Sequence, residues 1–193
     1  ERSETASNTV ASGSDLGVTA TVILEIGTEE LPADFVRQAL DQLQQRVSRD
    51  LREARLGHGA VSVFGTPRRL VVSVADLEDR QPDLQEDRKG PPVAQAFKDG
   101  IPGPAAIGFA KRCGVDPSAL EQRDTPKGPC VFATVLTPGQ ACFELLQGLI
   151  PQWIDALQGR RFMRWGTGAQ RFSRPIRWLL ALKGSEVIPV VLG

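Results

Sequence analysis

Residues 21–54, TVILEIGTEELPADFVRQALDQLQQRVSRDLREA, contain the signals for a strand, a turn and a long helix in succession. The segment TVILEI (21–26) is rich in β-branched and aliphatic residues, which predicts a buried strand that ends at Gly27. From Val36 to Ala54 apolar residues recur at helical spacing, with Gln, Arg and Asp on the other face. This periodicity predicts one amphipathic helix that packs against the sheet.

The four-residue signal between this strand and this helix consists of Thr28, Glu29, Glu30 and Pro32. We interpret it as a helix start with a capping hydroxyl, acids in the first turn and a proline near the first helical position. A catalytic acid/base pair is disfavoured, because adjacent helix residues do not share a face. A contact to a partner protein is the alternative for Glu29 and Glu30, since the turn before a helix is usually exposed.

The remaining patterns predict an α+β fold with a mainly antiparallel sheet and two long helices. Strands are expected at 61–64 and 70–77, so the first half has the order β-α-β-β. A second half of the same order is expected from elements at 130–136, 141–157, 176–182 and 187–192. A loop-rich insert separates the halves, with short helices at 104–114 and 117–122. We therefore predict a flexible linker or tail at 1–20, an α+β region at 21–193, halves at 21–80 and 129–193, and an insert at 81–128.

Composition excludes several classes of protein. The 193 residues carry 23 basic and 23 acidic side chains and are 41% hydrophobic, which is typical of a soluble globular protein. No apolar stretch approaches the ~20 residues of a membrane span. Three separated cysteines and one histidine argue against a disulfide framework or a zinc site. Because the chain begins with Glu, we expect it to be a piece of a longer protein.

The strongest cluster is GRRFMRWGTGAQRFSRPIRW (159–178), which holds six arginines, four aromatic residues and no acid. Guanidinium groups can bind phosphates and flat rings can stack on bases, so this pattern is typical of nucleic-acid binding. Arg164, Arg174 and Arg177 are expected to carry much of that contact. The alternative is a surface loop whose rings anchor it and whose arginines pair with acids. The candidate nucleic-acid-binding residues are Arg160, Arg161, Arg164, Trp165, Arg171, Arg174, Arg177, Arg68 and Arg69.

Signatures of an independent catalytic site are missing from the sequence. It has no G-x-x-x-x-G-K-[ST] phosphate loop and no G-x-S-x-G elbow. His58 lies in a polar Gly-His-Gly turn, where a solvated histidine is the plainer interpretation. We therefore assign no catalytic and no metal-binding residue to this chain.

Six strings, taken in order, resemble the start of the β subunit of bacterial-type glycyl-tRNA synthetase. They are EIGTEELP (25–32), TPRRL (66–70), RKGPP (88–92), GFAKRCG (108–114), MRWG (163–166) and RFSRPIRW (171–178). The resemblance implies a class II aminoacyl-tRNA synthetase, a glycine–tRNA ligase, whose α part carries the chemistry with ATP, Mg and glycine. This segment would hold no cofactor and would itself be non-catalytic.

The resemblance further implies that this segment binds tRNA-Gly and contacts an α subunit or an α-type domain, in an α2β2 assembly or a fused-chain dimer. The alternative is a pure assembly module that never touches RNA. A Ser/Thr-rich lead before EIGTEELP fits a fused organellar form, so plastid stroma is favoured over bacterial cytoplasm. No membrane association is expected.

Overall fold

The computed structural model describes residues 19–98, 100–160, 162–164 and 171–192. The chain divides into two compact units, one formed by residues up to 80 together with those from 141 onward, and the other by residues 81–140. Within the described residues, none of the helices has the length and apolar character needed to cross a membrane. The predicted α+β class is confirmed, since helices accompany sheets whose strands pair antiparallel.

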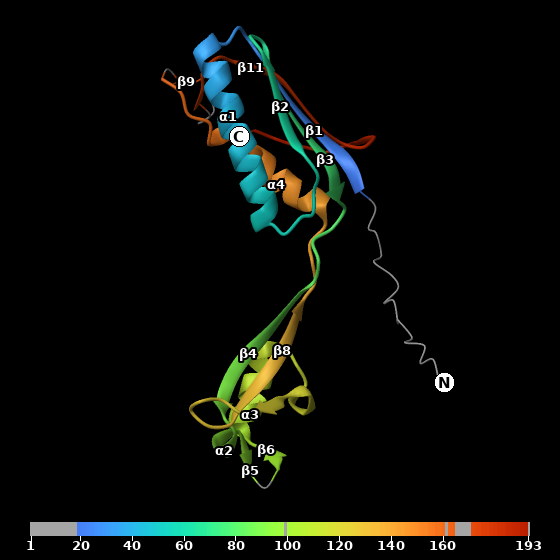
Figure 1. Cartoon of the computed structure of the whole chain (residues 1–193), viewed down its shortest axis with the longest axis vertical. Helices are drawn as coiled ribbons and strands as arrows, with labels where there is room; N and C mark the ends of the chain where they lie inside the picture. Colours follow the sequence, from blue (N-terminus) through green and yellow to red (C-terminus); the bar gives the residue numbers. More distant parts are fainter. Residues whose placement is uncertain (1–18, 99, 161, 165–170, 193) are drawn as a thin grey trace, which may run out of the picture. The chain divides into compact units, whose positions relative to one another are not determined.

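The first unit is built on a five-stranded antiparallel sheet (Figure 1). Its order is β12 (Glu186–Val187), β11 (Ile176–Lys183), β1 (Thr19–Thr28), β3 (Arg69–Glu78) and β2 (Val61–Thr66). The strand predicted at 21–26 is present, but it is buried on one face only: Val22, Leu24 and Ile26 are buried, whereas Ile23 and Glu25 face the other side. β1 pairs with β3 on one side and with β11 on the other, so strands from the start and from near the end of the described chain lie side by side in one sheet.

Two helices supply the rest of this core, α1 (Ala33–Glu53) and α4 (Cys142–Asp155). α1 buries every fourth residue, namely Phe35, Ala39, Leu43, Val47 and Leu51. α4 buries Leu146, Ile150 and Trp153 in the same hydrophobic cluster as β1. Both helices lie on one side of the sheet (Figure 1). No described helix covers the opposite side, where Phe64, Ile23 and Leu180 are exposed.

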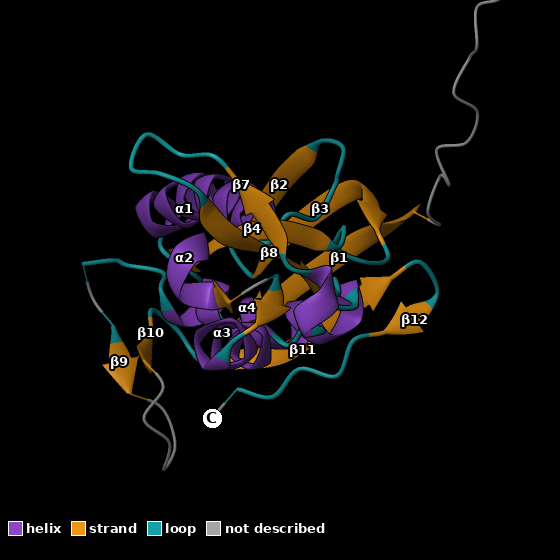
Figure 2. Cartoon of the chain, turned by 90° about the horizontal axis from the view of Figure 1, so that it is seen from below, coloured by secondary structure: helices purple, strands orange, loops and turns teal. Residues whose placement is uncertain are grey.

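A small hairpin follows α4, formed by β9 (Met163–Arg164) and β10 (Arg171–Phe172). It is a separate two-stranded ribbon beside the larger sheet (Figure 2). Phe172 is buried and meets Phe35 of α1 edge-on, with ring centroids 5.6 Å apart. Phe162 contacts both rings, so an aromatic cluster fixes the base of this hairpin to α1.

The second unit has its own sheet, in the order β4 (Leu84–Pro92), β8 (Cys130–Thr137) and β7 (Glu121–Arg123). It also contains α2 (Val93–Ala96), β5 (Phe97–Lys98), β6 (Ile101–Pro102), α3 (Pro104–Cys113) and the 3-10 turn η1 (Pro117–Ala119). A separate core of Val131, Ala133, Phe109 and Ala106 holds these elements together.

The structure differs from the expected division in two ways. Residues 130–137 form β8 and pair with β4 in the second unit, so they are not part of a second β-α-β-β half. The expected loop-rich insert contains the nine-residue strand β4, whose LQEDRKGPP sequence lacks an apolar pattern. Pairing with β8 stabilises this strand, and no local sequence signal reports such a partner.

Gly27 supports a tight contact that gives a stability prediction. A methyl group at this position would overlap the indole ring of Trp178. We expect Gly27→Ala to lower the free energy of unfolding by about 1–3 kcal/mol, as overpacking does. Denaturant unfolding monitored by tryptophan fluorescence measures the change. Gly148→Ala in α4 is the matched control, and it should raise stability by about 0.5–1 kcal/mol because alanine favours a helix. Equal stability of Gly27→Ala and wild type would contradict this contact.

Cys142, at the start of α4, gives a prediction about pH. Burial raises the pKa of its thiol to about 11, although nearby Lys183 acts in the opposite direction. An unfolded thiol ionises near pH ~8.5, so the unfolded chain loses this proton first. The free energy of unfolding should therefore fall as pH rises from ~8.5 towards 11. At pH 8 we expect alkylation of native Cys142, followed by mass spectrometry, to be far slower than alkylation of the denatured chain. Equal alkylation rates in the native and the denatured chain would contradict the burial of this thiol.

Candidate nucleic-acid interface

Three segments that are distant in sequence meet at one end of the five-stranded sheet. The Thr28 amide donates to the Arg68 carbonyl at 3.0 Å, and the Glu29 amide donates to the Pro175 carbonyl at 3.1 Å. The Leu31 amide also donates to the Pro67 carbonyl, at 2.6 Å. Residues 28–31 are therefore held between the β2–β3 turn and the start of β11. These bonds place the arginines of both flanking segments around one acidic turn.

Trp178 of β11 lies over Gly27 and is 43% exposed. Its indole Nε1 donates a hydrogen bond to Glu25 Oε1 at 2.8 Å. The ring is therefore oriented by the backbone beneath it and by a carboxylate on the neighbouring strand. An oriented and partly exposed indole can accept a stacked base or an apolar side chain.

Three of the predicted arginines at this end of the sheet have partners in the acidic turn or on β1. Arg69 Nε lies 3.4 Å from Glu25 Oε1, and Arg177 Nη1 lies 3.6 Å from Glu29 Oε1. Arg174 Nε donates to the Glu30 carbonyl at 3.2 Å. The cluster is free of acids only along the sequence, because the fold brings acids to it from residues 25–30. Sequence analysis missed Glu25, although its alternation on β1 places it on the side of the sheet that carries Trp178.

Arg164 and Arg171 are in a different situation. They are directly opposite each other in the β9–β10 hairpin, and both are exposed. Like charges opposite each other in a strand pair are destabilising. Among the described residues, neither side chain makes a hydrogen bond or an ion pair. This arrangement would be relieved by an anion bound between the two guanidinium groups.

The other predicted residues are dispersed. Arg160 lies in a surface hollow with Gln38, Asp41 and Gln42 of α1. Arg68 is exposed in the β2–β3 turn, and no described side chain pairs with it. Arg161 and Trp165 lie outside the described residues. The structure thus divides the predicted arginines into three groups. Arg164 and Arg171 lie on the hairpin, Arg160 lies beside α1, and the others described lie at the end of the five-stranded sheet.

The interpretation of Glu29 and Glu30 as helix-capping acids is wrong. α1 begins at Ala33, Pro32 is its N-cap, and the acid in its first turn is Asp34. Thr28 is the last residue of β1, and its buried hydroxyl has no hydrogen-bond partner among the described residues. The proline ends an extended segment here, so the helix starts after the predicted signal. Glu29 and Glu30 are exposed, which leaves the partner contact as the standing hypothesis.

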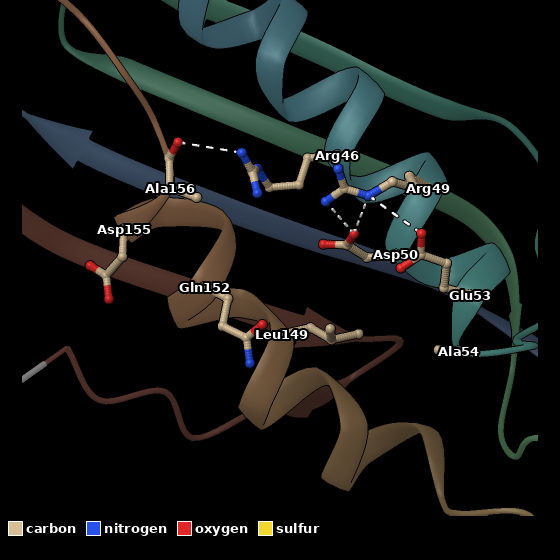
Figure 3. Close-up of a pocket in the computed structure, with 9 residues that line it drawn as sticks. All are labelled: Arg46, Arg49, Asp50, Glu53, Ala54, Leu149, Gln152, Asp155 and Ala156. Carbon is tan, nitrogen blue, oxygen red and sulfur yellow. Dashed lines mark hydrogen bonds and ion pairs between the residues drawn. The ribbon is translucent and has the colours of Figure 1, made fainter.

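A hollow between α1 and α4 is lined by charged residues, several of which form hydrogen bonds or ion pairs (Figure 3). Asp50 accepts from Arg49 at 2.7 Å and from the Trp153 indole at 2.9 Å. Arg46 reaches across to the Ala156 carbonyl at 3.4 Å. These bonds tie α1 to α4 and give the hollow a structural role. Within the described part of the chain, no group of three His, Cys, Asp or Glu residues could hold a metal ion.

The Glu29–Arg177 pair gives a measurable expectation. Both side chains are about half exposed, at 48% and 62%, so solvent screens their attraction. A double-mutant cycle with Glu29→Gln and Arg177→Gln should give a coupling below about 1 kcal/mol. Raising the salt concentration should reduce this coupling further. Chemical denaturation of the four proteins measures it. A coupling of several kcal/mol would mean that the pair is a major stabilising element of the turn.

The amino-acid sequence of the chain is similar to those of known proteins. The family profile of the glycyl-tRNA synthetase beta subunit matches residues 22–193. A glycine–tRNA ligase beta subunit of Picosynechococcus sp. is 53% identical over 173 residues, 90% of this chain and 24% of the relative. The corresponding chain of Synechocystis sp. is 52% identical over 170 residues, 88% of this chain and 24% of the relative.

A more distant relative extends the comparison beyond cyanobacteria. The glycine–tRNA ligase beta subunit of Moorella thermoacetica is 46% identical over 173 residues, 89% of this chain and 25% of the relative. The chain thus spans about a quarter of the length of the curated relatives it matches. The match over residues 22–193, together with these identities, establishes that the chain belongs to the glycyl-tRNA synthetase beta subunit family.

Proposed function

We propose that this chain is a tRNA-binding and subunit-assembling part of a glycine–tRNA ligase, which attaches glycine to tRNA-Gly with ATP. The ATP, its Mg and the glycine would be bound by an α-type partner, and this chain would contribute no catalytic residue. The observation that carries the RNA-binding part of the proposal is the opposed pair of Arg164 and Arg171 on the hairpin.

The hairpin is suited to a phosphate for three reasons. Its two arginines are exposed and occupy directly opposite positions of the strand pair, so their guanidinium groups can reach one phosphate. Its base is fixed by the Phe35, Phe162 and Phe172 cluster, which reduces the entropy lost when a ligand binds. No described acid neutralises the pair. A phosphate would therefore remove a repulsion as well as add an attraction.

The end of the sheet would contribute in a weaker way. Arg68 is unpaired among the described residues, whereas Arg69 and Arg177 are near Glu25 and Glu29. Ion pairs exposed to this degree contribute about 0–1 kcal/mol each, so a phosphate can compete for the same guanidinium groups. Trp178 would offer a stacking surface beside them. We therefore rank Arg164 and Arg171 above Arg174 and Arg177 as phosphate ligands.

A salt series tests this proposal. In the assembled synthetase, Arg164→Gln combined with Arg171→Gln should weaken tRNA binding at low salt. The slope of log K against log salt should fall in magnitude by about 0.7–0.9, which corresponds to the one phosphate contact that the pair would make. Binding titrations at four or more salt concentrations give the slope. Glutamine removes the charge and keeps most of the side-chain stem.

The matched control is Arg37→Gln with Arg52→Gln, which removes two exposed charges from α1. Its slope should stay within error of the wild-type slope, and thermal unfolding should show all proteins folded. A folded hairpin variant with the wild-type slope would reject the RNA contact. Loss of co-purification with the α-type partner at an unchanged slope would make assembly the leading function.

Assembly is the second candidate, and the helix-free side of the sheet favours it. Phe64 is 60% exposed and Leu180 39% exposed on that side, and both lie on strands of the sheet. Large exposed side chains gathered on one sheet face are typical of a protein-binding surface. Under this hypothesis the arginines pair with acids and the sheet packs against the α-type partner. Glu29 and Glu30, exposed beside the same sheet, would then contribute polar contacts.

The larger assembly and the compartment belong to the same proposal. We infer an α2β2 assembly or a dimer of fused chains, located in the plastid stroma or, alternatively, in a bacterial cytoplasm. The similarity to cyanobacterial chains supports either location.

A further inference from the structure

The second unit has a basic groove between β4 and α3 that the proposed function does not use. Its β4 side consists of Arg88, Lys89, Gly90 and Pro91, and its α3 side includes Phe109 and Arg112. Arg88, Lys89 and Arg112 are exposed, whereas Phe109 is buried and forms part of the groove floor. The groove thus has a basic rim and an apolar floor.

The fold fixes the two sides of this groove against each other. A methyl group on Gly90 would lie 2.6 Å from the Phe109 ring, so the glycine lets the ring pack closely on β4. Phe109 also belongs to the core formed with Val131 and Ala133 of β8. Because Phe109 and Arg112 are three residues apart on α3, they share a helix face. The guanidinium of Arg112 is therefore carried on a rigid, packed element.

Two acids of this unit, Asp87 and Glu121, are engaged away from the groove. Asp87 forms an ion pair with Arg123 and accepts from the Thr134 hydroxyl at 2.8 Å. The hydrogen bond from Arg123 holds the pKa of the Asp87 carboxyl below its usual range. Glu121 is bound by the same Arg123 at 2.7 Å. Since successive residues of a strand point to opposite faces, Asp87 and its partners lie across the sheet from Arg88.

Little negative charge remains near the groove. Glu86 approaches Arg88 at 3.8 Å, and both side chains are about half exposed, so this pair is weak. Arg112 makes no hydrogen bond or ion pair among the described residues. Two guanidinium groups are therefore available on facing sides of one groove.

We propose that this groove binds a backbone phosphate of RNA, as a second contact separate from the hairpin. The identity of the anion rests on the proposed tRNA-binding function. Arg88 and Arg112 donate to the phosphate oxygens, as guanidinium groups do in bidentate pairs. The second unit thus increases the number of RNA phosphates that the chain neutralises.

The experiment uses the assembled synthetase and its tRNA. Arg88→Gln with Arg112→Gln should reduce the magnitude of the salt slope by about 0.7–0.9, as expected for one lost phosphate contact. Lys98→Gln with Lys127→Gln is the matched control, because it removes the same charge from exposed sites of this unit outside the groove. The control should keep the wild-type slope. Arg88→Lys with Arg112→Lys keeps both charges and should largely restore the slope, which separates charge from folding.

The outcomes distinguish this site from the proposed function. If the hairpin variant changes the slope and the groove variant does not, the groove site is rejected while RNA binding stands. If neither variant changes it, both proposals fail. A groove variant that loses the α-type partner but keeps the slope shows a protein ligand and overturns the phosphate site. Equal slope losses in the groove variant and the lysine control would mean a general effect of charge, which also overturns it.

Discussion

The structure depends on the position of β1 at the centre of the five-stranded sheet. Ile26 is paired with Leu70 of β3 on one side and with Leu179 of β11 on the other. The first pairing is local in sequence, whereas the second closes a loop of more than 150 residues and must offset its entropy. Burial of Val22, Leu24 and Ile26 under α1 and α4 supplies that stabilisation.

The same pairing creates the candidate interface. Because β11 lies beside β1, the arginines before and within β11 meet Glu25, Glu29 and Glu30. The acids neutralise part of a cluster that is purely basic along the sequence. The hairpin pair of Arg164 and Arg171 is outside this neutralised zone and keeps its charge. The arginines therefore differ in their availability to a ligand, although the sequence presents them as equivalent.

In the second unit, ion pairs also determine which arginines are available for binding. Its core is small, so its stability depends strongly on the β4–β8 ladder and on Phe109 packing against Gly90. Arg123 holds Asp87 and Glu121 on one side of its sheet. On the other side, Arg88 has only the weak contact to Glu86, and Arg112 has no ion pair among the described residues. In both units, ion pairing on one surface determines which cations are available elsewhere.

The sequence by itself determined the strong local elements, because their periodicities report burial directly. The β-branched and aliphatic run at 21–26, the helical spacing in α1 and the apolar runs of β3 and β11 all predicted elements that the structure contains. Its ordered motifs also indicated the family. Only the tertiary structure decided that residues 130–137 pair with the charged strand β4. It also decided that Glu29 faces Arg177 instead of capping α1, and which arginines stay unpaired. These features depend on contacts between distant residues, and such contacts leave no period in the local sequence.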